Sequence, residues 1–166
     1  MPGKLTHIIG ILLAILSIAA ATVAIATGNV VAAWLGAPGM VLLLSLVHEF
    51  GHLLSCAIFG QKVKSFYYFT FHISSQGIQF RKDRSLRSYC TFAKGSNDLA
   101  VYAGGPIASL LAVCIVGIVL RGANLAILCL YGIISLLHLL ANLIPCRQND
   151  MKRILEIIRE RRCNKL

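Results

Sequence analysis

Four long apolar stretches limit what this 166-residue chain can fold into. They cover about residues 7–27, 39–60, 98–120 and 123–145, and a helix needs about 20 apolar residues to cross the hydrocarbon core of a bilayer. The composition, 57% hydrophobic and 13% charged, is too apolar for a soluble domain of this size. Barrel strands would show an alternating pattern, which the sequence lacks. We therefore expect an all-α polytopic membrane protein with four transmembrane helices in one domain.

The basic residues predict how these helices are oriented. The formal net charge is +10. One, seven and seven of the 16 Lys and Arg residues lie before the first stretch, in segment 61–97 and after residue 145, which leaves only Arg121 on the other side. The positive-inside rule then places both termini and segment 61–97 in the cytosol. This distribution explains the charge without nucleic acid, which we do not expect as a partner.

The first stretch also has the order of a signal peptide, with a short basic start, an apolar run and then small residues. We expect it to be a retained span. The apolar pattern that leads into the second stretch is interrupted at Gly36, Pro38 and Gly39, so we expect the regular helix to begin near Gly39. The six cysteines form no CxxC pair, and we expect reduced thiols.

Residues 61–95 predict a small β-hairpin on the cytosolic side. The run "KVKSFYYFTFHI" is β-branched and aromatic, "SSQG" is a turn signal, and "IQFRKDR" suits a second strand. Two roles remain open for this hairpin: an aromatic anchor at the membrane interface, or an edge strand that pairs with an extended peptide. The tail, residues 146–166, predicts an amphipathic helix on the anionic inner leaflet of the lipid bilayer.

The second stretch contains the sequence HEFGH, from His48 to His52. Histidines four residues apart share one helix face, so both imidazoles can reach one metal ion. Glu49 lies where it can act as a general base on water, the pattern of a zinc hydrolase. Ionisable groups inside a span are costly and indicate function. The alternative is a structural role, with the two histidines and Glu49 hydrogen-bonded inside the bundle.

Zinc needs a third protein ligand and an open position. Asp150 follows Pro145, where the fourth helix should break, and it suits either a ligand or a cap of the tail helix. If the fourth helix begins at Ala123, Pro145 lies about 33 Å along it. Asp150 would then have to turn back toward the histidines.

Three motifs together resemble the site-2 protease family of intramembrane zinc metalloproteases. HEFGH, "AGGPIAS" and "NLIPCRQND" are similar to its HExxH, GPxxN and NxxPxxxLDG motifs over about residues 39 to 151. The resemblance implies that His48, His52 and Asp150 hold Zn²⁺ and that Glu49 is the base. It also implies a membrane-associated hairpin. The candidate substrate-binding residues on the matching positions are Asn142, Pro145 and Ser109.

This chain departs from the family pattern at two places. Asn149-Asp150-Met151 replaces LDG, and Ser109 replaces the asparagine of GPxxN. No insertion is long enough for a PDZ or nucleotide-sensing domain, so we expect any regulation to come from a membrane partner.

Other residues are ambiguous in the sequence. Cys56 is either a soft ligand or an inert buried thiol, and His138 either lines the cavity or packs through a hydrogen bond. Gly104 and Gly105 suit a close approach of two helices.

The expected function is zinc-dependent hydrolysis of a peptide bond within the membrane, in a plasma membrane of bacterial or archaeal type. A substrate helix must unwind first, so we expect single-span proteins or short hydrophobic precursor peptides as substrates. Two alternatives are a membrane protein that binds or transports metal, and an inactive relative that binds transmembrane helices.

Overall fold

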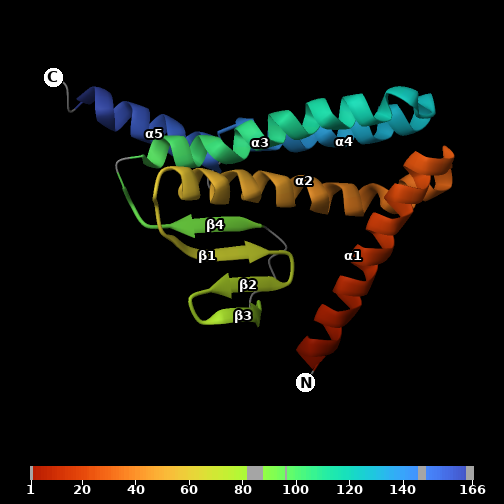
Figure 1. The fold of residues 1–166 in the computed structure, drawn as a ribbon, viewed down its shortest axis with the longest axis horizontal. Helices are drawn as coiled ribbons and strands as arrows, with labels where there is room; N and C mark the ends of the chain where they lie inside the picture. Colours follow the sequence, from red (N-terminus) through yellow and green to blue (C-terminus); the bar gives the residue numbers. More distant parts are fainter. Residues whose placement is uncertain (1, 82–87, 96, 146–148, 164–166) are drawn as a thin grey trace.

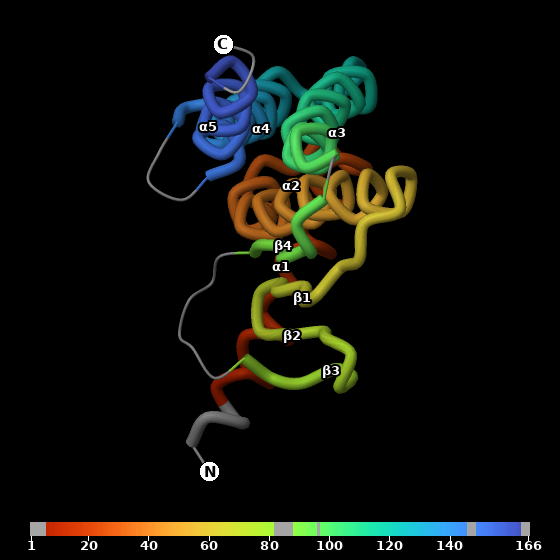
Figure 2. Tube along the Cα trace, turned by 90° about the vertical axis from the view of Figure 1, so that its left-hand side faces the viewer, coloured from red at the N-terminus to blue at the C-terminus, as the bar shows by residue number. Residues whose placement is uncertain are grey.

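Three long helices lie side by side, and a fourth diverges from them (Figures 1 and 2). The computed structural model describes residues 2–81, 88–95, 97–145 and 149–163. Helices α2 (Val30–Ile58), α3 (Asp98–Val119) and α4 (Leu125–Leu143) run together, and the short 3-10 helix η1 (Leu120–Gly122) leads from α3 toward α4. Helix α1 (Pro2–Thr27) joins α2 at one end and diverges from it. Helix α5 (Asp150–Cys163) lies beside the start of α3.

The expectation of four membrane-length helices is confirmed. Segments Thr6–Thr27, Val30–Ile58, Asp98–Gly122 and Leu125–Leu143 are each long and apolar enough to cross a membrane. Where these helices pack together, the buried core consists mainly of small and aliphatic side chains around Tyr131. The Tyr131 hydroxyl donates a hydrogen bond to the Ala33 carbonyl and so ties α4 to α2.

The prediction that the second helix begins near Gly39 is wrong, because α2 begins at Val30 and continues through Pro38. Asn29 caps its start by accepting a hydrogen bond from the Ala32 N–H. Proline disturbs the hydrogen bonds of the turn before it. Here the Ser17 hydroxyl of α1 accepts from the Gly39 N–H and donates to the Leu35 carbonyl, both at 2.8 Å. Ser17 of α1 therefore provides hydrogen bonds to the turn of α2 that Pro38 weakens.

The two glycines near Pro38 pack α1 against α2. A Cβ atom on Gly36 would lie 2.5 Å from the Cα atom of Ala21, and one on Gly39 would lie 2.6 Å from the Ile18 nitrogen. Non-bonded atoms do not come this close, so only glycine at these two positions lets the backbones of α1 and α2 touch. They are contact points and not helix breaks.

The predicted hairpin forms around the "SSQG" turn as the antiparallel pair β2–β3, but it is part of a larger four-stranded antiparallel sheet in the order β3-β2-β1-β4. The bounds are Val63–Tyr68 (β1), Phe71–Ser74 (β2), Gly77–Phe80 (β3) and Tyr89–Phe92 (β4). The long first strand that we expected is split at Phe69, whose positive φ of 49° makes a turn without glycine. The expected "SSQG" turn does form, and Gly77 supplies its positive φ of 96°.

The sheet lies between α1 and α2 (Figure 1). On the α2 side, the Tyr68 hydroxyl donates to the Leu42 carbonyl. On the α1 side, the His7 ring stacks on Phe80 with 5.2 Å between centroids. Across the sheet, Tyr67 stacks on His72 of β2 and on Tyr89 of β4. The sheet is thus held from both sides, next to the HEFGH helix.

The tail forms the expected helix, α5, which begins at Asp150. Helix α4 ends at Leu143, two residues before the predicted end at Pro145. Residues 82–87, 146–148 and 164–166 of the predicted hairpin and tail, Cys146 among them, lie outside the described residues. The five described cysteines are free thiols.

Helices α2 and α3 touch through glycine. A Cβ atom on Gly104 would lie 2.5 Å from the Gly51 carbonyl oxygen, and one on Gly51 would collide with the carbonyl oxygen of Gly104. The expected close approach at Gly104 is therefore present, and Gly51 is its partner.

Gly104→Ala should force α2 and α3 apart, because the added methyl group overlaps backbone that cannot move aside. We expect a loss of stability of about 1–3 kcal/mol, measured by thermal unfolding in detergent. Gly117→Ala is the control on the same helix, since a Cβ atom there meets nothing within 4 Å. Equal unfolding temperatures for the two variants would contradict the contact.

Candidate metal centre

Two histidines and a glutamate of α2 point into the protein interior. His48, Glu49 and His52 are 5%, 5% and 3% exposed. The spacing of four residues brings the Nε2 atoms of His48 and His52 to 3.3 Å from one another. Phe50, which lies between them on the helix, is 60% exposed and points away from the interior. The buried polar face of α2 is thus confined to the HEFGH turn and the residues in line with it.

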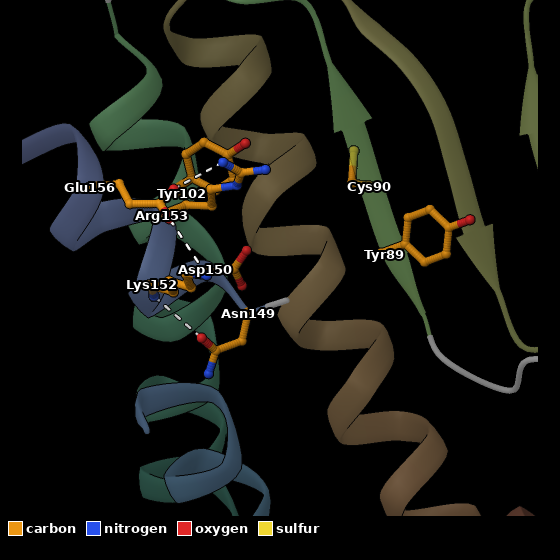
Figure 3. Close-up of a pocket in the computed structure, with 8 residues that line it drawn as sticks. All are labelled: Tyr89, Cys90, Tyr102, Asn149, Asp150, Lys152, Arg153 and Glu156. Carbon is orange, nitrogen blue, oxygen red and sulfur yellow. Dashed lines mark hydrogen bonds and ion pairs between the residues drawn. The ribbon is translucent and has the colours of Figure 1, made fainter. Parts of the chain in front are cut away.

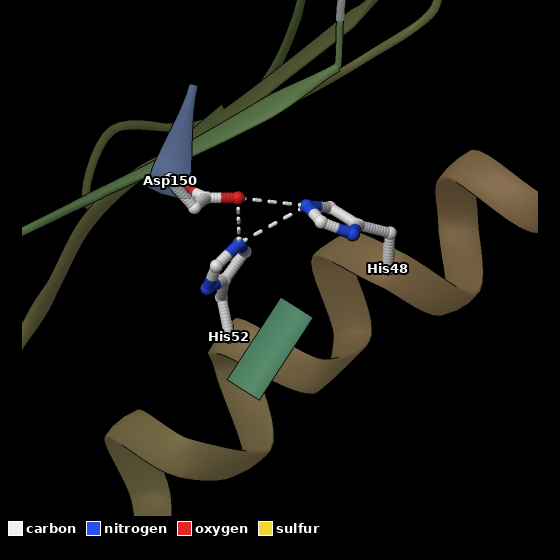
Figure 4. Close-up of side chains that lie close together, drawn as sticks. All are labelled: His48, His52 and Asp150. Carbon is white, nitrogen blue, oxygen red and sulfur yellow. Dashed lines mark hydrogen bonds and ion pairs between the residues drawn. The ribbon is translucent and has the colours of Figure 1, made fainter. Parts of the chain in front are cut away.

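Asp150 reaches both imidazoles from α5 (Figure 4). Its Oδ2 atom lies 2.9 Å from Nε2 of His48 and 3.0 Å from Nε2 of His52. Asp150 can turn back toward the histidines, as expected from the sequence, because α4 ends at Leu143 and a separate helix, α5, begins at Asp150. The alternative role of Asp150 as the helix cap is wrong: the side chain of the preceding residue, Asn149, accepts the hydrogen bond from the Lys152 N–H.

The far side of each imidazole is held by α3. The Nδ1–H group of His52 donates to the Val101 carbonyl at 2.8 Å, which leaves the lone pair on Nε2. Nδ1 of His48 lies 2.8 Å from the hydroxyl of Ser109, which is 1% exposed. Ser109, a candidate substrate contact by sequence, is thus placed behind a histidine, where it orients the ring.

Gly105 makes room for the imidazole pair. A Cβ atom on this residue would lie 2.6 Å from Cε1 of His52 and 2.7 Å from Nε2 of His48, and it would collide with Nε2 of His52. Any other residue would therefore displace the nitrogen atoms that face Asp150. From the sequence we expected only helix packing here, because glycine in a membrane helix is usually a packing signal.

His48, His52 and Asp150 form a group that could hold a metal ion. The facing atoms are 2.9 to 3.3 Å apart, close to the spacing of about 3.3 Å between ligands 2.0–2.1 Å from a tetrahedral ion. Lone pairs of an imidazole and a carboxylate repel one another unless a proton or a cation lies between them. In addition, Oε2 of Glu49 is buried without a hydrogen-bond partner, which suits a site for a further polar group. The residues therefore fit a metal ion.

Two opposing effects act on the Asp150 carboxyl group. Burial, the largest, raises its pKa, while hydrogen bonds from His48 and His52 and the charges of these two rings, which act when Nε2 carries a proton in place of a metal ion, lower it. The lowering effects win, so the pKa lies well below its ordinary value. The carboxylate is therefore ionised at neutral pH and ready to bind a cation.

Strand β4 closes the site on the sheet side. The backbone amide of Cys90 approaches the Glu49 carboxylate. Burial raises the pKa of the Cys90 thiol to about 12, and the charges of Cys56, Glu49 and Asp150 act in the same direction. The thiol is therefore protonated at neutral pH. Cys56 is buried at 1% exposure and lies outside the metal-binding group.

A cavity of about 250 Å³ adjoins Asp150 (Figure 3). Its walls come from β4, α3 and the first two turns of α5, and its lining residues are Tyr89, Cys90, Tyr102, Asn149, Asp150, Lys152, Arg153 and Glu156. Glu156 lies 2.9 Å from Arg153 and 3.7 Å from Lys152. Of the metal-binding group, Asp150 therefore lines this cavity.

The remaining predicted site residues lie on α4 or just after it. His138 makes hydrogen-bond contacts with Ser45 of α2 at 3.3 Å and with Asn142 at 3.4 Å, and its ring centroid is 6.1 Å from that of His48. Asn142 also donates to the His138 carbonyl at 2.9 Å. Pro145 is exposed. The structure thus gives His138 a packing role beside the site, and the substrate-binding role of Asn142 and Pro145 stays a prediction.

Comparison with protein family models, with curated proteins and with solved structures finds no match for this chain.

Ser109→Ala should weaken metal binding, because His48 loses the hydroxyl that orients its ring. We expect an affinity about 10- to 100-fold lower, measured by competition with a chelator in detergent solution. Ser135→Ala is the matched control: Ser135 is equally buried, but it donates only to a carbonyl of its own helix, that of Tyr131. The same affinity for Ser109→Ala and the unchanged chain would remove Ser109 from the site.

Proposed function

We propose that this chain is a zinc-dependent intramembrane endopeptidase. The observation that carries the proposal is the convergence of His48, His52 and Asp150 beside Glu49. His48, Glu49 and His52 belong to α2, a helix of membrane-spanning length, and Asp150 begins the separate helix α5. Burying His48, Glu49 and His52 among apolar helices is costly and indicates a functional reason.

Zinc is the metal that we propose for the group. Two imidazole nitrogens and one carboxylate oxygen are a typical donor set of catalytic zinc sites, which keep a fourth position open. Zinc bound there would polarise a carbonyl group as a Lewis acid and increase the nucleophilicity of water at neutral pH. Ser109 and Val101 orient the imidazole rings of His48 and His52 through hydrogen bonds, and Asp150 contributes a negative charge.

Glu49 is the proposed general base. Its unpartnered Oε2 atom is buried beside the metal-binding residues, where it can accept a proton from an attacking water molecule. The same carboxyl group can then return the proton to the nitrogen of the leaving amine. The low exposure of Glu49 excludes bulk water, which strengthens electrostatic interactions in the site.

The proposed substrate is an extended peptide from a single-span protein or from a short hydrophobic precursor. Strand β4 is an edge of the sheet, and its free side faces α2 (Figure 1). A peptide that pairs with this edge would pass Glu49. Because the Cys90 amide approaches Glu49, β4 has to shift away from α2 before a peptide can enter. The proposal therefore includes an opening movement of the sheet and leaves room for a regulatory membrane partner.

The membrane orientation is part of the proposal. The basic residues of α5 and of segment 61–97 support a cytosolic side that carries the sheet and both termini. On this arrangement the cavity beside Asp150 opens toward the cytosol, from which water would enter.

Glu49→Gln tests the base. The amide cannot accept a proton, so cleavage of a co-expressed single-span substrate should fall by at least about 100-fold, while zinc content stays the same. Product bands on a gel and metal analysis of the purified protein measure the two effects. Glu160→Gln, which changes an exposed glutamate of α5, is the control. Unchanged cleavage by Glu49→Gln would rule out the proposed mechanism.

Zinc should also stabilise the fold, because it binds the folded chain at a site joining α2 to α5. Free zinc at 100 times its Kd should add about 2.7 kcal/mol to the stability, seen as a rise in unfolding temperature that a chelator reverses. Asp150→Ala should abolish the rise. A rise that persists in Asp150→Ala would place the metal elsewhere.

Two results would favour the alternative functions. A protein that contains no zinc and cleaves no substrate would favour an inactive relative that binds transmembrane helices. Uptake of zinc into vesicles that contain the protein would favour metal transport.

A further inference from the structure

Asn149 lies between the end of α4 and the start of α5, directly before the proposed metal ligand Asp150. Its side chain makes hydrogen bonds to both helices. An asparagine carboxamide carries two N–H donors and one carbonyl acceptor, so it can serve two helix ends at once. Figure 3 shows Asn149 beside Asp150, at the wall of the cavity.

The donor end of the side chain contacts the last turn of α4. Nδ2 of Asn149 donates to the carbonyl groups of Ile144, Ala141 and Asn142, the last two at 3.4 and 3.5 Å. The last carbonyl groups of a helix have no partner within that helix, so this contact satisfies groups that would otherwise need water.

The acceptor end starts α5. Oδ1 of Asn149 accepts from the Lys152 N–H at 3.3 Å, and the Asn149 backbone carbonyl accepts from the Arg153 N–H at 3.4 Å. This is the pattern of an N-cap, for which asparagine is among the preferred residues. One side chain therefore closes one helix and opens the next.

We infer that Asn149 is a positioning residue that locks the end of α4 to the start of α5 and so fixes the Asp150 carboxylate on the imidazoles. The inference rests on the proposed metal centre. Asp150 follows Asn149 directly, and its Oδ2 atom must meet two Nε2 atoms at 2.9 and 3.0 Å. A small rotation of the first turn of α5 would break both contacts. The lock also places this turn relative to α4, which packs against α2.

The chemistry of the lock distinguishes asparagine from its nearest isostere. Aspartate has the same shape and keeps the acceptor for the Lys152 N–H, but when ionised it has no donor for the α4 carbonyls. Alanine has neither the acceptor for the Lys152 N–H nor the donor for the α4 carbonyl groups. A simple N-cap needs only the acceptor, whereas a lock between two helices needs the donor as well.

The test measures metal affinity of the full-length protein in detergent, by competition between the protein and a chelator for Zn²⁺. Asn149→Ala and Asn149→Asp should each bind zinc about 10- to 100-fold more weakly, as expected when a residue that orients a ligand is lost. Co²⁺ substitution gives a second readout, since a displaced carboxylate changes the visible absorption of the ion. Thermal unfolding of the metal-free proteins reports stability separately.

Two further variants complete the experiment. Asn124→Ala removes the cap at the opposite end of α4, where Oδ1 accepts from the Ala126 N–H at 2.9 Å, and it should leave zinc affinity unchanged. Asp150→Ala defines the affinity without the carboxylate ligand.

The outcomes separate the inference from the proposed function. Wild-type affinity in both Asn149 variants, together with weak binding by Asp150→Ala, would overturn the lock and leave the metal centre intact. Wild-type affinity in Asn149→Asp alone would show that an N-cap suffices, and this too would overturn the lock. Wild-type affinity in Asp150→Ala would remove the metal centre and the inference with it.

Discussion

The contact between one carboxylate and two buried imidazoles holds the site together. Asp150 connects α5 to the HEFGH turn of α2, and each partner is poorly tolerated in an apolar environment without the other. Much of the surrounding architecture serves this contact. Ser109 and Val101 of α3 orient the rings, and Asn149 aims the carboxylate. The site therefore depends on α2, α3, α4 and α5 being in place at the same time.

Glycine at the α2–α3 interface makes this arrangement sterically possible. Gly51 and Gly104 let the two backbones touch, and Gly105, one residue on, leaves space for the imidazole nitrogens. Close helix contact and ligand placement are thus produced by neighbouring residues of one turn. A change that separates the helices would also move Ser109 and Val101 away from the rings that they hold.

The sequence predicted the features that arise from local patterns. Spacing within HEFGH placed His48 and His52 on one face, and apolar length identified four helices. The motif spacing also pointed to Asp150 as a partner. The errors came from contacts between distant residues: Ser17 repairs the turn around Pro38, and β4 pairs with β1 across an intervening segment. Phe69 adopts a positive φ that its residue type does not suggest. Asn149 did carry a signal, since asparagine often precedes a helix, but its donors to α4 depend on where that helix ends.

The Ser17 bridge has a consequence for how the chain must be assembled. If α1 were cut away as a leader, α2 would keep a proline in its middle and lose the hydroxyl that stands between Gly39 and Leu35. Gly36 and Gly39 would then lose the backbone of α1 that covers them, and the Gly39 amide and the Leu35 carbonyl group would lose the Ser17 hydroxyl as their partner. In this structure the first hydrophobic segment therefore supplies hydrogen bonds that complete the helix bearing the histidines.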